Sequence, residues 1–326
     1  MRLLVTGGAG YVGSITVEAL LAAGHEVLVI DDLRSGHRSA LHPDARFVHA
    51  DIADESAVRA ALAAQPCDAL LHFAAASLVG DSMRDPHSYF RSNVAGTLAL
   101  LRAVSAAGIE RVVFSSTAAL YGTPERTPIP ESAALAPESV YGETKLQIER
   151  ALQWLARTTG LASVSLRYFN AAGASAQRGE DHRPESHLIP LVLQVAAGRR
   201  ERIQVFGDDY PTSDGTAIRD YIHVEDLADA HVRALQALEP HTAKAYNLGN
   251  GQGASVAEVV TAVRAVTGRE VPTEIVARRA GDPPVLVADA ALARRELGWT
   301  PQRPDLRDIV ADAWRWHLDH PRGYDA

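Results

Sequence analysis

Short runs of β-branched and other apolar residues alternate with longer amphipathic stretches through the first half of the chain. The short runs predict strands, the amphipathic stretches predict helices, and their alternation is typical of βαβ units in a parallel sheet. Right-handed crossovers would make this sheet doubly wound. The predicted strands lie near residues 2–6, 26–30, 46–49, 69–73, 111–115 and 163–168, and the predicted helices near 12–23, 57–64 and 87–107.

The pattern becomes less regular after residue 170. Residues 173–186 are polar and predict a mobile loop, whose length favours a role in binding substrate. Further on, a capping box from Ser255 to Glu258 opens a helix that ends at Gly268. We therefore expect an α/β fold with a Rossmann-type doubly wound sheet over residues 1–173, to which the chain returns near 220–250, and a smaller α/β domain over 174–326.

Composition excludes several classes of protein. With 326 residues, 47% of them apolar, the chain can fill a large core. The formal net charge of -8 argues against a nucleic-acid-binding face, and no apolar segment approaches the roughly 18 residues of a membrane span. The single cysteine, Cys67, excludes an internal disulfide framework and fits a reducing compartment. We expect a cytoplasmic protein with no nucleic-acid, membrane or metal partner.

Three glycines follow the first predicted strand and lead into a predicted helix: Gly7, Gly10 and Gly13. Such a turn lets the backbone approach a pyrophosphate, and the free N–H groups of the helix start point at it. The spacing Gly-x-x-Gly-x-x-Gly by itself also fits an ordinary strand-to-helix turn. Asp31 and Asp32, about twenty residues further on, are the second element of a dinucleotide site, because a carboxylate there binds ribose hydroxyls.

These two carboxylates also select the dinucleotide. They would repel a 2′-phosphate, which favours NAD over NADP, and the alternative is a solvated loop acid or a helix cap. Asp51 and Ile52 follow the third strand and are candidate adenine contacts. Residues 73–76 end the fourth strand with small side chains, which would let the backbone approach the cofactor.

The candidate catalytic pair is Tyr141 and Lys145, which lie four residues apart and so share one helix face. A cation there would lower the pKa of the phenol below about 10, towards a general base. Lys145 and Lys244 are the only lysines, in a chain that otherwise uses arginine. Ser115 and Thr117 close the preceding strand, where a hydroxyl could share a proton with the tyrosine. The alternatives are a surface cation–π pair and a simple turn.

These motifs resemble the extended short-chain dehydrogenase/reductase family and, within it, the 4-epimerases of UDP-hexoses. The resemblance covers nearly the whole chain through further motifs at residues 72–75, 167–170, 206–212, 219–224, 246–249 and 296–299. It implies tightly bound NAD, inversion of C4 in UDP-glucose and UDP-galactose through a 4-keto intermediate, and a homodimer joined near Asn93 and Tyr141. Residues 174–326 would then bind the UDP-sugar.

The resemblance also assigns site residues by position. The catalytic residues would be Thr117, Tyr141 and Lys145. NAD would contact Gly7, Gly10, Tyr11, Val12, Gly13, Asp31, Asp32, Leu33, Ser35, Gly36, Asp51, Ile52, Phe73, Ala74, Ala75, Ser77, Ser92, Asn93, Ser115, Tyr141, Lys145 and Phe169. The UDP-sugar would contact Thr117, Tyr141, Asn170, His187, Leu188, Gln204, Phe206, Arg219, Arg279, Asp282 and Leu286.

The sequence departs from the family pattern at four places. Ser77 stands where some members carry a lysine near the nicotinamide, and Ser92 precedes Asn93 where many have paired asparagines. His187 occupies a position often filled by a UDP-binding asparagine. Leu286 replaces a tyrosine that narrows the sugar pocket in some members, which makes an N-acetylated sugar conceivable.

Three alternatives to a UDP-hexose epimerase follow from the same residues. A 4,6-dehydratase would need an Asp-Glu pair after Thr117, where this chain has Ala118 and Ala119. A related epimerase could act on a UDP-N-acetylhexosamine, a UDP-pentose or a UDP-uronate. An NAD-sensing module would keep the glycine turn but would not need Tyr141 and Lys145.

Overall fold

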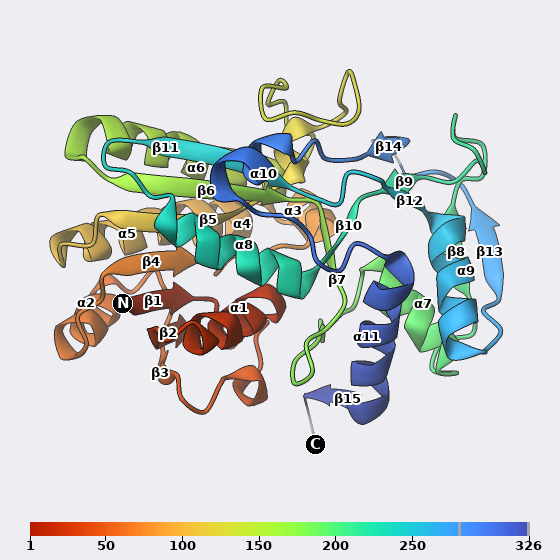
Figure 1. Cartoon of the computed structure of the whole chain (residues 1–326), viewed down its shortest axis with the longest axis horizontal. Coiled ribbons are helices and arrows are strands. Elements are labelled where there is room, and N and C mark those ends of the chain that lie inside the picture. Colours follow the sequence, from red (N-terminus) through yellow and green to blue (C-terminus); the bar gives the residue numbers. More distant parts are fainter. Residues whose placement is uncertain (280–281, 325–326) are drawn as a thin grey trace.

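A seven-stranded sheet forms the centre of the computed structural model, which describes residues 1–279 and 282–324 (Figure 1). Its strands are the short apolar runs of the sequence, and β4 is buried along its whole length. The strands are β1 (Arg2–Thr6), β2 (Glu26–Asp31), β3 (Arg46–His49), β4 (Ala69–His72), β5 (Arg111–Thr117), β6 (Ala162–Tyr168) and β11 (Ala243–Leu248).

The strand order is β11-β6-β5-β4-β1-β2-β3, and every neighbouring pair is parallel. The chain adds strands on one side of β1 and then crosses to add the rest on the other side, which confirms the doubly wound topology. The switch point lies between β1 and β4, where such sheets bind ligands at their carboxyl edge. The seventh strand, β11, is not among the predicted strands, although it falls within the predicted return of the chain near 220–250.

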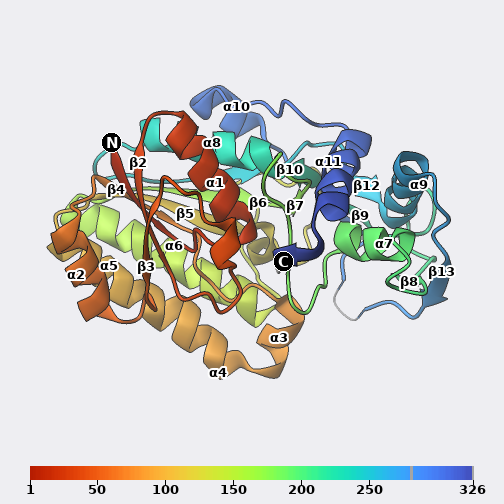
Figure 2. The same ribbon diagram turned by 90° about the horizontal axis from the view of Figure 1, so that it is seen from below.

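Helices cover both faces of the sheet (Figure 2). The apolar sides of α1, α8 and α10 form one buried cluster with one face, and those of α2, α5 and α6 form a second cluster with the other face. These six helices are α1 (Tyr11–Ala22), α8 (Val224–Gln236), α10 (Ala291–Leu297), α2 (Glu55–Ala64), α5 (Gly96–Ala106) and α6 (Val140–Thr159). Among the described residues, no helix is long and apolar enough to cross a membrane.

The helix predicted over residues 87–107 contains a π-helical segment. It consists of α4 (Pro86–Tyr89), the π segment η2 (Phe90–Ala95) and then α5. Periodicity cannot distinguish this arrangement from a regular helix, because a π turn adds only one residue to a turn. Asn93 lies in this segment and is buried.

The smaller part of the chain packs beside the carboxyl edge of the sheet (Figures 1 and 2). Its core lies between α7, α9 and α11, and short paired strands lie on either side of them. The remaining elements are the helices α3 (Val79–Arg84), α7 (Leu188–Ala196), α9 (Val256–Thr267) and α11 (Leu306–Asp319), the 3-10 turns η1 (Arg38–Ala40) and η3 (Ala118–Tyr121), and the strands β7 (Asn170–Ala172), β8 (Ile203–Phe206), β9 (Ile218–Arg219), β10 (Tyr221–His223), β12 (Ala254–Ser255), β13 (Thr273–Val276), β14 (Val285–Leu286) and β15 (Pro321–Tyr324).

The two parts are interleaved in sequence. Ala290, Ala293, Leu297 and Trp299 belong to the same buried cluster as β1 and α8, whereas the expected boundary leaves them in the second domain. The chain therefore contributes to the core of the large sheet a second time after residue 250.

Several contacts hold the segment 173–187 in place, whereas its polar composition predicts a mobile loop over residues 173–186. Arg178 is buried, and it contacts the Glu18 carboxylate at 3.0 Å and the Ala40 carbonyl at 2.8 Å. His37 contacts the Asp181 carbonyl at 2.8 Å. Polar side chains of this segment thus join it to α1 and to the loop after β2, and composition does not reveal that pairing.

Candidate active site

The glycine turn packs closely against neighbouring backbone at the carboxyl end of β1. Gly7 has φ +76°, and a Cβ added there would lie 2.5 Å from the Ala74 nitrogen. A Cβ on Gly13 would lie 2.1 Å from the Gly7 carbonyl oxygen, so the first turn of α1 needs glycine to pack this closely. Helix α1 begins at Tyr11 without a side-chain cap or an acid in its first turn. Its N-terminus is therefore free to face an anion such as a pyrophosphate.

Asp31 holds the glycine turn in position. Its carboxylate accepts hydrogen bonds from the Ala9 nitrogen at 3.0 Å and the Leu33 nitrogen at 2.8 Å, and burial raises its pKa. Gly36 packs against Ala9, since an added Cβ would lie 2.8 Å from the Ala9 carbonyl carbon. The predicted cofactor residues 31–36 thus form one wall beside the turn, with Ser35 in the loop of that wall.

Asp32 and Asp51 are bridged by the side chain of Arg34. The Arg34 guanidinium contacts the Asp32 carboxylate at 2.6 Å and the Asp51 carboxylate at 2.5 Å. Ile52 is buried in the core between α2 and α5. Asp32 therefore has a cation beside it, whereas Asp31 faces backbone N–H groups.

Asn93 fixes the backbone that follows β4. Its amide accepts from the Ala76 nitrogen at 2.8 Å and donates to the Ala76 carbonyl at 3.0 Å. The Asn93 Nδ2 also donates to the Thr144 hydroxyl at 3.1 Å, and the Ser92 hydroxyl donates to Asn93 Oδ1 at 3.3 Å. Asn93 thus ties the predicted cofactor segment that contains Ala74, Ala75 and Ser77 to helix α6.

Tyr141 lies in the first turn of α6 and is brought close to the end of β5. Ser139 caps this helix by accepting from the Gly142 nitrogen at 3.1 Å. A Cβ on Gly142 would lie 2.6 Å from the Ala119 carbonyl oxygen, so glycine lets the helix approach the turn after Thr117. The Thr117 hydroxyl and the Tyr141 phenol form a hydrogen bond.

Lys145 lies one turn after Tyr141 on α6 and is buried. Its ammonium donates to the Ser115 carbonyl at 2.9 Å, and it lies 4.9 Å from the centre of the Phe114 ring and 5.9 Å from that of Tyr141. Burial lowers its pKa to about 7. Lys145 is thus buried and Tyr141 is half-buried, which argues against the surface-pair alternative.

The expectation that Lys145 lowers the pKa of Tyr141 below about 10 is wrong for the protein residues by themselves. Burial raises the pKa of Tyr141 to about 12, and the hydrogen bond with Thr117 lowers it only in part. The reason is that desolvation of the phenolate outweighs a lysine whose own positive charge is disfavoured by burial. A further charge at the site would be needed to generate the phenolate near neutral pH.

Four further aromatic residues lie around the predicted cofactor and substrate residues: Tyr11, Phe73, Tyr168 and Phe169. The Tyr168 phenol, at the end of β6, forms a short hydrogen bond with the predicted cofactor residue Ser115, and burial raises its pKa. Tyr11 donates from its hydroxyl to the Gly173 carbonyl at 2.6 Å, and Val12 follows it in α1. Phe73 packs its ring 4.6 Å from His231, and Phe169 packs against the cluster around Ala118.

Apart from Thr117 and Tyr141, most of the predicted substrate residues lie in the smaller part of the chain. Arg219 forms a short ion pair with Asp282, and the Arg279 guanidinium lies 3.9 Å above the centre of the Phe206 ring. One arginine thus lies over an aromatic ring, and the other is paired with Asp282, whose backbone nitrogen donates to the Arg279 carbonyl at 3.3 Å. A nucleoside diphosphate needs cations and an aromatic ring of this kind.

Other predicted substrate residues are spread around this group. Asn170 donates from its backbone nitrogen to the Asp220 carbonyl at 2.9 Å, and Leu188 begins α7. Leu286 pairs with Arg219 in register between β14 and β9. Gln204 is exposed on β8. The His187 ring contacts carboxylates of its own loop instead of the Arg219 group, at 2.7 Å from Glu180 and 3.2 Å from Glu185.

The sequence matches the NAD dependent epimerase/dehydratase family over residues 3–249. The chain belongs to this family. It is 51% identical over 327 residues to a UDP-glucose 4-epimerase of Halalkalibacterium halodurans, across 99% of this chain and 98% of the relative.

Two solved structures of the epimerase/dehydratase family extend the similarity to the fold. A crystal structure of a UDP-glucose 4-epimerase superposes with a TM-score of 0.97 at 47% identity and covers 100% of both chains. The epimerase of Stenotrophomonas maltophila, solved with bound NAD and formylated UDP-arabinopyranose, superposes with a TM-score of 0.95 at 46% identity and covers 99% of both chains.

Behind the catalytic edge of this epimerase/dehydratase fold lies a buried ion pair that sequence reasoning missed. Arg167 and Glu149 are 2.6 Å apart and almost fully buried. Glu149 accepts from the Ser116 hydroxyl at 2.5 Å, and Arg167 donates to the Tyr121 hydroxyl at 2.9 Å. The pair holds Ser116, the neighbour of Thr117, in place. Arg167 stands in a family motif, but nothing in the sequence pairs it with Glu149.

Ser82 is a second residue that the sequence did not indicate. Its hydroxyl accepts from the Tyr141 nitrogen at 3.1 Å. Because Ser82 lies on the short helix α3, which periodicity does not predict, no sequence signal could have found it.

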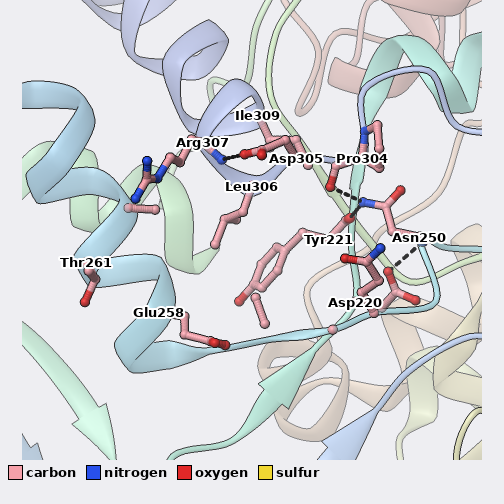
Figure 3. A pocket seen from close by; sticks show the side chains of 14 residues that line it. Asp220, Tyr221, Asn250, Glu258, Thr261, Pro304, Asp305, Leu306, Arg307 and Ile309 are labelled. Atoms are coloured by element: carbon pink, nitrogen blue, oxygen red, sulfur yellow. Dashed lines mark hydrogen bonds between the residues drawn. The ribbon is translucent and has the colours of Figure 1, made fainter.

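A surface pocket lies on the smaller domain, apart from the catalytic edge (Figure 3). Asp220 lines it, and this carboxylate accepts from the Asn250 nitrogen at 2.7 Å and from the nitrogens of Gly251 and Ala288 at 3.0 Å. Asn250 also forms hydrogen bonds with the Tyr221 and Pro304 carbonyls. Among the described residues that line the pocket, none is a predicted site residue. The Asp220 carboxylate and the Asn250 nitrogens join neighbouring loops, whereas Asn250 Oδ1 is buried without a hydrogen-bond partner among the described residues.

Proposed function

We propose that this chain is a UDP-glucose 4-epimerase that uses NAD to interconvert UDP-glucose and UDP-galactose in galactose metabolism. The observation that carries the proposal is the placement of Tyr141, Thr117 and Lys145 at the carboxyl end of β5, two strands away from the strand β1 that leads into the glycine turn. The relatives at about half identity carry the same activity in their names.

The proposed cofactor site is the turn after β1 and the wall formed by residues 31–36. The N-terminus of α1 would face the pyrophosphate, and Asp31 would bind a ribose hydroxyl with lone pairs left over from its two backbone bonds. When bound, NAD accepts and returns a hydride at its nicotinamide ring, whose positive charge also favours the Tyr141 phenolate.

The proposed proton carrier is Tyr141. It would take the proton of the sugar 4-hydroxyl while C4 becomes a ketone, and it would return the proton after the 4-keto sugar has turned over and been reduced on its other face. Thr117 would hold the reacting oxygen and the phenol in one hydrogen-bonded group. Lys145 would keep a positive charge near the phenol in the fraction of molecules in which it is protonated.

The proposed UDP site is the group around Phe206. Arg219 and Arg279 would bind the diphosphate, and Asp282 would orient Arg219. Asn170 and Leu188 lie at the ends of the segment that connects the two domains, where they could contact the nucleotide from its other side.

The deciding experiment follows UDP-galactose and NADH together. The purified protein should convert UDP-galactose to UDP-glucose, and UDP-glucose to UDP-galactose, with no net NADH. NADH released in proportion to product would contradict the proposal and indicate a dehydrogenase instead.

Replacement of the proton carrier tests its role separately. Tyr141→Phe should keep NAD, measured as cofactor that co-purifies with the protein, and should lose turnover by at least about 100-fold, since general base catalysis contributes about 10²–10⁴. Tyr89→Phe is the matched control, because Tyr89 donates to the Leu78 carbonyl and not to Thr117. Full activity of Tyr141→Phe would rule out Tyr141 as the base.

A second candidate substrate is a UDP-N-acetylhexosamine. Leu286 is the observation that favours it, because this side chain packs near Ala118 and Phe169, and leucine is smaller than tyrosine. A panel of UDP-hexoses, UDP-N-acetylhexosamines, UDP-pentoses and UDP-uronates tests it. Leu286→Tyr should reduce activity on the N-acetylated sugar and preserve activity on UDP-galactose.

We also propose a cytoplasmic homodimer. Apolar side chains are exposed on the helices that lie over α6 and on α5, namely Val79, Met83, Phe90 and Leu98. A second copy packed there would remove them from water. Leu98→Glu should lower the molar mass measured by light scattering to that of a monomer, whereas Ile275→Glu, on exposed β13, should leave the mass unchanged.

A further inference from the structure

The structure brings two histidines and two glutamates together in the segment that connects β7 to α7. The ligating atoms of Glu180, His182, Glu185 and His187 all lie within 4.8 Å of one another. We propose that these four residues bind one divalent transition-metal ion, for which zinc is the best match. This inference stands apart from the epimerase proposal and departs from the sequence-based expectation of a protein without metal.

The distances between the ligating atoms fit a small tetrahedral ion. Glu180 Oε1 lies 2.7 Å from His187 Nδ1 and 3.0 Å from His182 Nδ1. Glu185 Oε1 lies 3.2 Å from His187 Nδ1, and Glu185 Oε2 lies 3.8 Å from His182 Nδ1. Zinc bonds of about 2.0–2.2 Å place tetrahedral ligands about 3.3–3.6 Å apart. To reach this spacing, the shortest separation, 2.7 Å, would have to grow by about 0.6 Å, and the widest, up to 4.8 Å, would have to shrink by about 1.2 Å.

The chemistry of the donor set selects the metal. Two imidazole nitrogens and two carboxylate oxygens suit zinc, whereas calcium and magnesium prefer oxygen ligands alone. Two carboxylates also balance the charge of a dication when both imidazoles are neutral. The competing arrangement is a set of ion pairs between two imidazolium groups and two carboxylates, in which two protons take the place of the metal.

The surroundings of the four residues hold them as ligands would need to be held. The side chains of Glu180 and Glu185 are 8% and 7% exposed. Glu185 accepts from the backbone nitrogens of Ser186 at 2.7 Å and His187 at 2.8 Å, which fixes its carboxylate. His317 lines the same small cavity as Glu180, and its Nε2 is buried without a hydrogen-bond partner among the described residues. An additional nitrogen is thus buried beside the site without a partner.

A metal at this site would hold the segment that connects the two domains in place. His187 immediately precedes α7, and the His182 ring lies 6.3 Å from the ring of Tyr11, edge to face, next to the glycine turn. Tyr11 in turn binds the Gly173 carbonyl at the start of the same segment. A metal at this place would fix the segment that joins the cofactor turn to the start of α7.

Metal binding is tested on the full-length protein without an affinity tag. After treatment with a chelator, titration with zinc against a chromophoric competitor should show about one equivalent bound per chain. Cobalt added in place of zinc should give the intense visible absorption of a four-coordinate ion. Neither readout depends on epimerase activity, so failure here would leave the proposed function unaffected.

The double variant His182→Asn, His187→Asn should bind zinc at least about 100-fold more weakly, more than the 10–100-fold that outer-shell changes cost. A second variant, Glu180→Gln with Glu185→Gln, should give the same loss while keeping both imidazoles. His42→Asn is the control, because His42 faces only one carboxylate, Asp44, at 3.8 Å. Retention of bound NAD checks that each variant is folded.

Three results would overturn the proposal. Zinc below about 0.1 equivalents in the wild-type protein would leave only the ion-paired arrangement. Equal affinity in the wild-type protein and in both double variants would place the metal elsewhere. Cobalt that shows only the weak absorption of a six-coordinate aquo ion would exclude the tetrahedral set.

Discussion

The ammonium of Lys145 is fully buried with one backbone carbonyl as its hydrogen-bond partner, and burial lowers its pKa to about 7 from the usual 10.5. At and below pH 7 the folded state bears the full cost of the buried charge, since the unfolded lysine is protonated. As pH rises from 7 towards 10.5, the unfolded state holds more protons than the folded state, so the stability of the folded state increases. Lys145, which we propose supports catalysis, therefore destabilises the protein at neutral pH.

Lys145→Met should remove the part of the pH dependence of folding stability that comes from the lysine. The free energy of unfolding of the wild-type protein should increase relative to that of the variant by roughly 2 kcal/mol between pH 7 and pH 9. Urea unfolding of both proteins at the two pH values measures it, and the variant should also lose turnover. An identical pH dependence in the two proteins would mean that Lys145 keeps an ordinary pKa.

Gly142 determines how closely Tyr141 approaches Thr117. Gly142→Ala places a methyl group 2.6 Å from the Ala119 carbonyl oxygen, which is backbone and has little freedom to move. We expect a loss of about 1–3 kcal/mol in stability together with a fall in kcat, because α6 must shift away from β5. Gly80→Ala is the control, since nothing lies within 4 Å of its added Cβ, and it should change neither quantity in this way.

At the scale of elements, the segment 173–187 depends on Arg178. Arg178→Ala removes the contacts with Glu18 on α1 and with the Ala40 carbonyl, which should cost about 1–3 kcal/mol. The freed segment should be cut faster by a protease specific for acidic residues, and UDP should bind more weakly because α7 begins at the end of this segment. Arg59→Ala, which breaks an exposed pair with Glu55, should leave the cleavage rate unchanged.

Some helices and strands could be predicted from the sequence, and others could not. Capped or strongly periodic helices such as α9, and strands buried on both faces such as β4, follow from local pattern. The π segment of residues 90–95 does not, because it has the composition of a regular helix. The anchoring of residues 173–187 does not either, since it depends on partners more than 100 positions away in the chain.

At the scale of the whole molecule, the large domain is assembled from separate parts of the chain. A fragment of residues 1–173 lacks strand β11, helix α8 and Trp299, so the part of the sheet face that α1 does not cover would be exposed to water. We expect this fragment to unfold without a cooperative transition in urea and to bind a hydrophobic dye, whereas the full chain should unfold cooperatively. A sharp transition in the fragment would show that residues 1–173 are an independent domain.

The sequence by itself determined six of the seven strands of the sheet, its winding, the glycine turn and the Tyr141–Lys145 pair, because alternating periodicity and short fixed spacings are local properties of a strand or of one helix face. Only the tertiary structure decided the rest. It placed Asn93 on the backbone after β4, joined Arg167 to Glu149, raised the pKa of Tyr141 and brought Glu180 beside His187. These effects arise from burial and from side-chain contacts made by folding, and the spacing of residues along the chain predicts neither.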